Sequence, residues 1–159
     1  MPAVSCESLC QIIGRHTENV CQTMAGVSVS LLEDQNARLT PDACGAVMSL
    51  VGMTGAWKGT GAIACSGDLA RRLCGKLLMT EFAEVDAEVL DAMGEFANMI
   101  IGNVKEDIAQ ELGPFALSTP TVIHGDAMHT REGRGDLRAR VLFDCEGDVL
   151  EVRISLAPA

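Results

Sequence analysis

The stretch D-A-M-G-E-F-A-N, residues 91–98, lies inside the longest helical pattern of the sequence. Between about residues 86 and 112, apolar residues recur every three or four positions, and they are Val89, Met93, Phe96, Ile100, Val104 and Ile108. This is the period of an α-helix that buries one face. At about 100° per residue, Asp91, Glu95 and Asn98 fall together on the opposite face. The segment therefore predicts a rigid helix from which carboxylates and a carboxamide point outward.

The residue types on this outer face allow two interpretations. Any amphipathic helix in water shows charged residues there, and on periodicity alone the acids are a solvated stripe. Asn98, Gly94 and Gly102 are different, because they are weak helix formers. The Asn amide competes for backbone hydrogen bonds, and each Gly costs about 1 kcal/mol relative to Ala. Gly102 follows Asn98 by one turn. Three such residues in one helix indicate that another group comes close to it.

The spacing of this segment resembles a known signature. Asp91-x3-Glu95-x2-Asn98, followed after 21 intervening residues by Pro120 in S-T-P-T-V-I, resembles the pattern of the CheC/CheX/FliY family of chemotaxis phosphatases. The segment G-M-T-G-A-W-K-G-T-G-A-I-A, residues 52–64, followed by D-L-A-R-R-L, is similar to the first strand pair and short helix of that family. The resemblance covers most of the chain.

The first predicted helix, residues 5–24, separates two types within this family. A two-site member of the CheC type carries a second E-x2-N pattern on this helix. Here Glu7 is followed three residues later by Cys10, and Glu18 by Cys21. The sequence is therefore similar to the single-site CheX type.

The resemblance implies a hydrolase that acts on the aspartyl phosphate of a phosphorylated CheY-like response regulator, in chemotaxis or another two-component circuit. In-line hydrolysis needs an oriented water, and a carboxamide can accept from and donate to water without a charge that repels phosphoryl oxygens. By resemblance, Asn98 positions that water and Glu95 docks to the lysine of the receiver domain, while Asp91 and Gly102 belong to the partner-binding surface. The Mg²⁺ belongs to the partner, so no cofactor of its own is expected. CheX-type relatives form dimers through their sheets, which implies a homodimer.

A second class of function is a non-catalytic module that binds a receiver domain or associates with the flagellar motor. The flagellar switch proteins resemble this architecture but lack the E-x2-N pattern. The presence of both Glu95 and Asn98 favours activity.

The remaining patterns predict one α/β domain of the α+β type over residues 1–159, with a mostly antiparallel sheet and two long helices packed on one face. A short helix begins at Ser66 or Asp68, and a strand begins or bends at Pro120. The other predicted strands are residues 27–34, 46–53, 59–65, 137–143 and 150–156, with T-G-A-W-K joining the second to the third and C-E-G-D joining the last two. Alternation in the final hairpin predicts one core face and one wet face, with arginines opposite acidic residues.

Composition excludes several classes of protein. The formal net charge of −10 argues against nucleic-acid binding, which needs a dense footprint of lysine and arginine. The amino terminus lacks the basic and apolar parts of a signal peptide, so the chain is expected in the cytoplasm. Residues 43–65 hold a single charge but several glycines, which favours buried strands over a membrane span.

Cysteines and histidines do not form a ligand pattern. The seven cysteines include no C-x-x-C pair and are interpreted as small buried hydrophobic residues instead of a disulfide framework or a zinc site. His124, Asp126 and His129 in H-G-D-A-M-H are interpreted as a polar loop, because no second ligand cluster accompanies them. His16 falls on the apolar stripe of the first helix and is expected at the core edge with a satisfied ring nitrogen.

Overall fold

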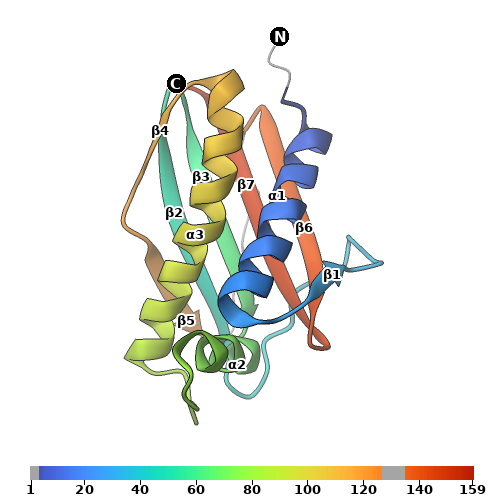
Figure 1. Cartoon of the computed structure of the whole chain (residues 1–159), viewed down its shortest axis with the longest axis vertical. Coiled ribbons are helices and arrows are strands. Elements are labelled where there is room, and N and C mark those ends of the chain that lie inside the picture. The colour runs from blue at the N-terminus through green and yellow to red at the C-terminus, as the bar shows by residue number, and fades with distance from the viewer. Residues whose placement is uncertain (1–3, 127–134) are drawn as a thin grey trace.

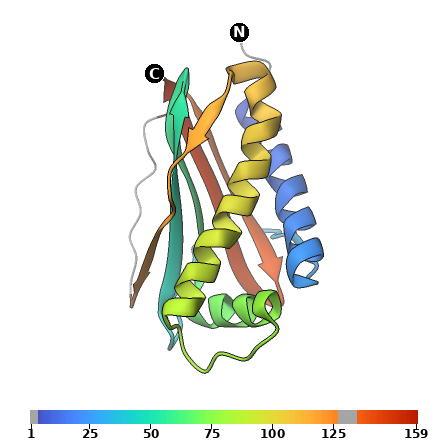
Figure 2. The same cartoon turned by 60° about the vertical axis from the view of Figure 1, so that its left-hand side comes forward.

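The structure is a computed structural model that describes residues 4–126 and 135–159. Its described strands form one seven-stranded sheet in the order β1-β6-β7-β3-β2-β4, with β5 also paired to β2, and every described pairing is antiparallel. The strands are β1 (Val29–Leu31), β2 (Ala46–Gly55), β3 (Trp57–Ser66), β4 (Phe115–Leu117), β5 (Thr121–Gly125), β6 (Leu137–Cys145) and β7 (Asp148–Pro158). The helices α1 (Cys6–Val20) and α3 (Ala87–Leu112) cover one face of the sheet, and α2 (Gly67–Leu78) lies at its end (Figures 1 and 2). The predicted fold class is confirmed.

Both long helices begin at the residues that the sequence indicates. Ser5 caps α1 in a capping box with Ser8, and Asp86 caps α3 by accepting a hydrogen bond from the Val89 amide at 3.0 Å. After Val20 the first helix continues as a π-helical turn (Cys21–Ala25) and ends at Gly26, whose φ is +64°. The predicted helix over residues 5–24 is therefore right in extent, although its last turn has a wider hydrogen-bond pattern.

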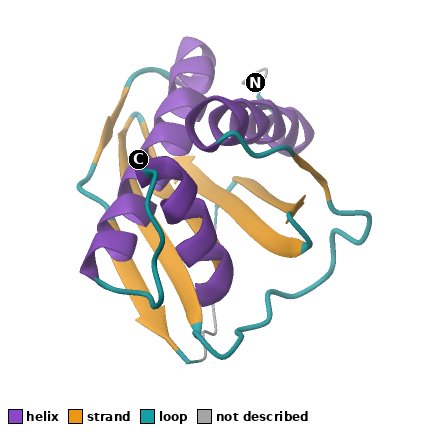
Figure 3. Ribbon diagram, turned by 60° about the horizontal axis from the view of Figure 1, so that its bottom comes forward, coloured by secondary structure: helices purple, strands orange, loops and turns teal. Residues whose placement is uncertain are grey.

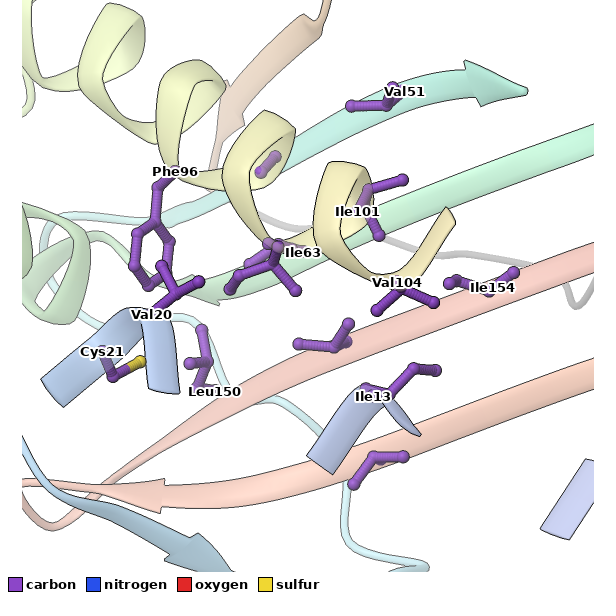
Figure 4. Packing of buried hydrophobic residues seen from close by; sticks show 14 of the residues in the cluster. Ile13, Val20, Cys21, Val51, Ile63, Phe96, Ile101, Val104, Leu150 and Ile154 are labelled. Carbon is purple, nitrogen blue, oxygen red and sulfur yellow. The ribbon is translucent and has the colours of Figure 1, made fainter. Parts of the chain in front are cut away.

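The core fills the space between the two long helices and the sheet. Side chains from α3, including Phe96 and Ile101, meet Ile63 of β3 and residues of β7, while Ile13 of α1 closes the other side (Figure 4). All four of these side chains are fully buried. Because burial of a large apolar side chain contributes about 1.5–3 kcal/mol, this layer holds α3 rigidly on the sheet.

The predicted strand pair 46–53 and 59–65 is confirmed, but both strands are longer than expected. The strands β2 and β3 continue through most of T-G-A-W-K, so Ala56 alone separates them. The pairing between β2 and β3 does end at Met53 and Gly59, so T-G-A-W-K joins them as predicted. Its residues are nevertheless extended, because 54–55 pair with β4 and 57–58 pair with β7. No helix among the described residues is long and apolar enough to cross a membrane.

The prediction of a wet outer face on the final hairpin was wrong for part of that face. Leu142 and Glu151 point away from the helices, yet they are 0% and 3% exposed. The connection from β1 to β2, drawn as a long loop in Figure 3, places Gln35 where its side chain bonds both the amide and the carbonyl of Leu142. The expected pairing with acids is found for Arg140 and Arg153, which both bond Glu151.

All seven cysteines are free thiols, as predicted, and four of them are buried. Burial raises the pKa of Cys21 and of Cys74 to about 12 and that of Cys145 to about 11, and it also raises the pKa of Cys65. The interpretation as buried hydrophobic residues was wrong for the other three, because Cys6 is exposed and Cys10 and Cys44 are partly exposed.

Candidate functional site

The outer face of α3 carries the residues that the sequence analysis selects. The helix buries its apolar stripe against the sheet, so Asp91 and Glu95 point to solvent and are exposed. Asn98 and Gly102 are only partly exposed, because they lie nearer to the border between the outer face and the sheet edge. The structure therefore places the two carboxylates in water and the carboxamide at a boundary.

That boundary is formed by an edge of the sheet that the sequence predicts only in part. The strands β4 and β5 pair with the two halves of β2, at Met53–Gly55 and at Ala46–Leu50. The predicted strand near Pro120 is β5, whereas β4 was not predicted. With three residues, F-A-L, β4 is too short for alternation to reveal it.

The edge strands run alongside α3 in the opposite direction, and contacts mark their path. A methyl group on Gly94 would lie 3.3 Å from Pro120 Cγ and 3.3 Å from Val122 Cγ2. A methyl group on Gly102 would have Leu117 Cδ1 at 4.0 Å as its nearest neighbour. Asn98 lies one turn from each glycine, so residues 117–120 pass beside it. The sequence predicts that another group comes close to α3 at its weak helix formers. At Gly94 that group is Pro120 of the same chain.

The carboxamide of Asn98 has an unusual environment. Its Oδ1 is buried and accepts no hydrogen bond from the described residues. A buried oxygen without a donor is uncommon in folded proteins and is unfavourable by about 1–3 kcal/mol. Turning the oxygen toward solvent would therefore break no hydrogen bond on that atom and would give it water as a donor.

The carboxylates near Asn98 pair with no cation among the described residues. Within residues 4–126 and 135–159, neither Asp91 nor Glu95 forms an ion pair or a side-chain hydrogen bond. Glu84 and Glu88 are also exposed, and the first cation along α3 is Lys105. The Lys105 ammonium donates to the Phe115 carbonyl at 3.3 Å and so ties α3 to β4. The first half of α3 thus presents an uncompensated negative surface.

The histidines lie elsewhere. His16 Nε2 is 2.7 Å from Asp107 Oδ2, which confirms a core-edge histidine with a bonded ring nitrogen. His124 Nε2 lies 2.8 Å from the Cys44 carbonyl oxygen, Asp126 is exposed, and His129 lies outside the described residues. Among the residues that the structure describes, no group of three His, Cys, Asp or Glu side chains could hold a metal ion.

The chain combines an antiparallel sheet, covered on one face by helices, with a polar site on its longest helix. In that site, carboxylates that pair with no described cation lie close to a carboxamide. A family model described as Chemotaxis phosphatase CheX matches residues 47–150, and the chain belongs to this family. Among curated proteins, none matches this chain.

Solved structures with the same fold cover nearly the whole chain. Chemotaxis protein CheX from Vibrio vulnificus is 24% identical with a TM-score of 0.78, over 97% of this chain and 99% of that one. A CheC-like superfamily protein from Shewanella sp. PV-4 is 26% identical with a TM-score of 0.74, over 93% and 96%. The CheX in the CheX–CheY–BeF3–Mg²⁺ complex from Borrelia burgdorferi is 21% identical with a TM-score of 0.73, over 92% and 96%.

Proposed function

We propose that this chain stimulates hydrolysis of the aspartyl phosphate on a CheY-like receiver domain. The observation that carries the proposal is the pair on α3: Glu95 is exposed and unpaired, and one turn later Asn98 has an amide oxygen that makes no internal hydrogen bond. Membership of a chemotaxis phosphatase family supports the reaction, and the Borrelia burgdorferi complex of a CheX with CheY supports the class of partner.

Asn98 is the residue that orients the attacking water. When its carboxamide turns outward, Oδ1 accepts a hydrogen bond from water and the NH2 group donates nearby, without a charge that repels phosphoryl oxygens. The helix that carries it is fixed by a buried stripe and by its N-cap, so the water is held in one place. The protein itself holds no metal in this mechanism, because the Mg²⁺ belongs to the receiver domain.

Glu95 is the docking residue. Its carboxylate lies one turn before Asn98 and is free to pair with the lysine beside the phosphoryl group of a receiver domain. Asp91 adds negative charge to the same surface, and Gly102 lets the partner's backbone approach because it has no side chain. The role of Glu95 is to orient the lysine and hold the complex, and proton transfer is not required of it.

The test is phosphate release from a phosphorylated CheY-like receiver domain with Mg²⁺, measured for wild type, Asn98→Ala and Asn103→Ala. Asn103 is an exposed asparagine on the same helix and serves as the matched control. We expect Asn98→Ala to lower stimulated release by roughly 10²-fold, because a reacting group that is misplaced by about 1 Å can slow a reaction by about that factor. Binding to the receiver is expected to stay, and Asn103→Ala is expected to behave as wild type.

Two results would contradict the proposal. Full activity of Asn98→Ala would remove that residue from the chemistry. Tight binding of the phosphorylated receiver by wild type, with no stimulation of release, would identify a non-catalytic receiver-binding module on the same fold.

We also propose that the chain forms a homodimer through the outer face of its sheet. A groove on that face is lined by Met48 and Leu50 of β2, Ala62 of β3, and neighbouring residues of β6 and β7. Light scattering should give twice the chain mass of 16.8 kDa for wild type and the single mass for Leu50→Glu. Leu78→Glu changes an exposed leucine on α2 and should stay dimeric. A wild type that is monomeric at all concentrations would overturn the dimer.

A further inference from the structure

We propose that Ser118 is a positioning residue for Asn98, acting through a β-bulge in the edge of the sheet. The inference rests on the proposed function and names a residue that the sequence signature does not include. Ser118 is exposed, lies between β4 and β5, and belongs to the S-T-P segment that passes beside α3.

The bulge is defined by the register of the two edge strands. Leu117 pairs with Met53, and Thr121 pairs with Leu50. Between these pairs the edge has three residues, 118–120, whereas β2 has only two, Val51 and Gly52. One extra residue on one strand is a β-bulge, and it reverses which residues of the following strand face the core.

Because of the bulge, a different set of side chains from β5 faces α3. Leu117 faces the helices with Met53, so an unbulged strand would turn Thr119, Thr121 and Ile123 inward by simple alternation. With the bulge, Pro120 and Val122 face inward and contact the Gly94 position. The wall beside Asn98 therefore depends on this single extra residue.

Ser118 supplies the hydrogen bond that holds the bulge. Its amide donates to the Gly52 carbonyl at 2.9 Å, as in a regular antiparallel pair. The Gly52 amide, however, donates to Ser118 Oγ at 2.8 Å, so the hydroxyl takes the place of the Ser118 carbonyl. The same hydroxyl donates to the Thr119 carbonyl at 3.0 Å. Without the hydroxyl, water or the carbonyl of a straightened strand must take its place at the Gly52 amide, and neither holds the bulge in this geometry.

The experiment compares Ser118→Ala with Ser118→Thr, which keeps the hydroxyl, and with Thr54→Val as the matched control. Thr54 lies on β2 beside the same edge strand, and its hydroxyl donates to the Ala116 carbonyl at 3.4 Å without replacing a ladder bond. We expect Ser118→Ala to lower kcat for stimulated phosphate release about tenfold with KM nearly unchanged. Ser118→Thr should restore kcat, and Thr54→Val should match wild type.

Two further readouts separate positioning from general stability. In the Asn98→Ala background, Ser118→Ala should cause no additional loss, because it acts through Asn98. Hydrogen exchange of the Gly52 amide should be slow in wild type and fast in Ser118→Ala, and this readout needs no phosphatase activity.

Results that differ from these expectations overturn the inference. An unchanged kcat in Ser118→Ala, with or without faster exchange at Gly52, would show that the bulge does not position Asn98. An equal loss in Thr54→Val would show that the edge matters only for folding, and a further loss in the Asn98→Ala background would place Ser118 elsewhere in the reaction. If wild type does not stimulate release, the proposed function fails and the inference with it, whatever the exchange shows about the bulge.

Discussion

Two acidic regions of the molecule treat their carboxylates in opposite ways. At the corner between α2 and the β6–β7 turn, Arg72 bonds Asp68 at 2.8 Å and Glu146 at 3.0 Å, and it also pairs with Asp148. Lys76 bonds Glu146 as well. On the outer face of α3, no described cation pairs with Asp91 or Glu95. In the first region the carboxylates are paired with cations of the same chain. In the second, called the open surface below, they are not paired with any described cation.

The difference indicates separate uses of negative charge. In the corner, the acids join a helix to a hairpin that is distant in sequence, and hydrogen bonds from Arg71 and Arg72 hold the pKa of Asp68 below its ordinary value. Asp91 and Glu95 pair with no cation among the described residues, although the chain carries a net charge of −10 and has only 12 lysines and arginines for 22 acids. Charge left open beside a carboxamide is therefore charge available to a partner.

The largest expected contrast comes from removing one acid of each kind. Glu95→Ala should raise KM for the phosphorylated receiver about tenfold, equivalent to about 1.4 kcal/mol, because a docked lysine loses its partner. Glu146→Ala should leave KM unchanged and instead lower the free energy of unfolding by up to about 1 kcal/mol. Steady-state phosphate release and urea unfolding of both variants measure the two effects. An unchanged KM in Glu95→Ala would mean that the open surface does not dock the receiver.

The two glycines of α3 sharpen the same comparison between internal packing and an open surface. Gly102→Ala should raise stability by about 0.5–1 kcal/mol, since Ala is the better helix former and its methyl group has room. It should also weaken receiver binding, because the methyl group enters the surface that the partner approaches.

Gly94→Ala should behave differently, because its methyl group would press on Pro120 and Val122 at 3.3 Å. The steric effect opposes the gain in helix propensity, so stability should stay level or fall by about 1 kcal/mol. Binding should be retained while kcat falls, because the wall beside Asn98 moves. Thermal unfolding and receiver binding should be measured for Gly94→Ala and Gly102→Ala. If both variants change stability and binding in the same way, the two glycines do not have different roles.

The sequence predicts those parts of the site that depend on local pattern. The period of apolar residues places Asp91 and Glu95 on the solvent side of α3, and Asp86 marks where the helix begins. The environment of Asn98 does not follow from the helix alone, because Oδ1 is buried and the glycines one turn away on each side face residues 117–122. The sheet edge beside α3 is built from an edge strand of three residues and a bulge, which only long-range pairing determines.

The same limit explains the error on the outer face of the sheet. Alternation in the final hairpin correctly assigns Val152 and Ile154 to the core. It cannot show that Gln35, more than one hundred residues earlier, bonds the backbone of Leu142, or that Arg140 and Arg153 both pair with the buried Glu151. Local pattern predicts the direction of a side chain, whereas its exposure depends on what the rest of the chain places over it.

The smallest expected effect concerns acid stability and again separates the two regions. Hydrogen bonds from Lys76, and then from Arg72, lower the pKa of Glu146 in the folded protein. Such a group stabilises the fold above its unfolded pKa, near 4.5, and this contribution is lost as the pH falls through the lower folded value. Glu146→Gln should therefore lower the urea midpoint at pH 7 by a small amount and make its decline below about pH 4.5 less steep. Glu95→Gln, which breaks no internal pair, should leave the midpoint unchanged at both pH values, and a matching loss in that variant would mean that the α3 surface is not open after all.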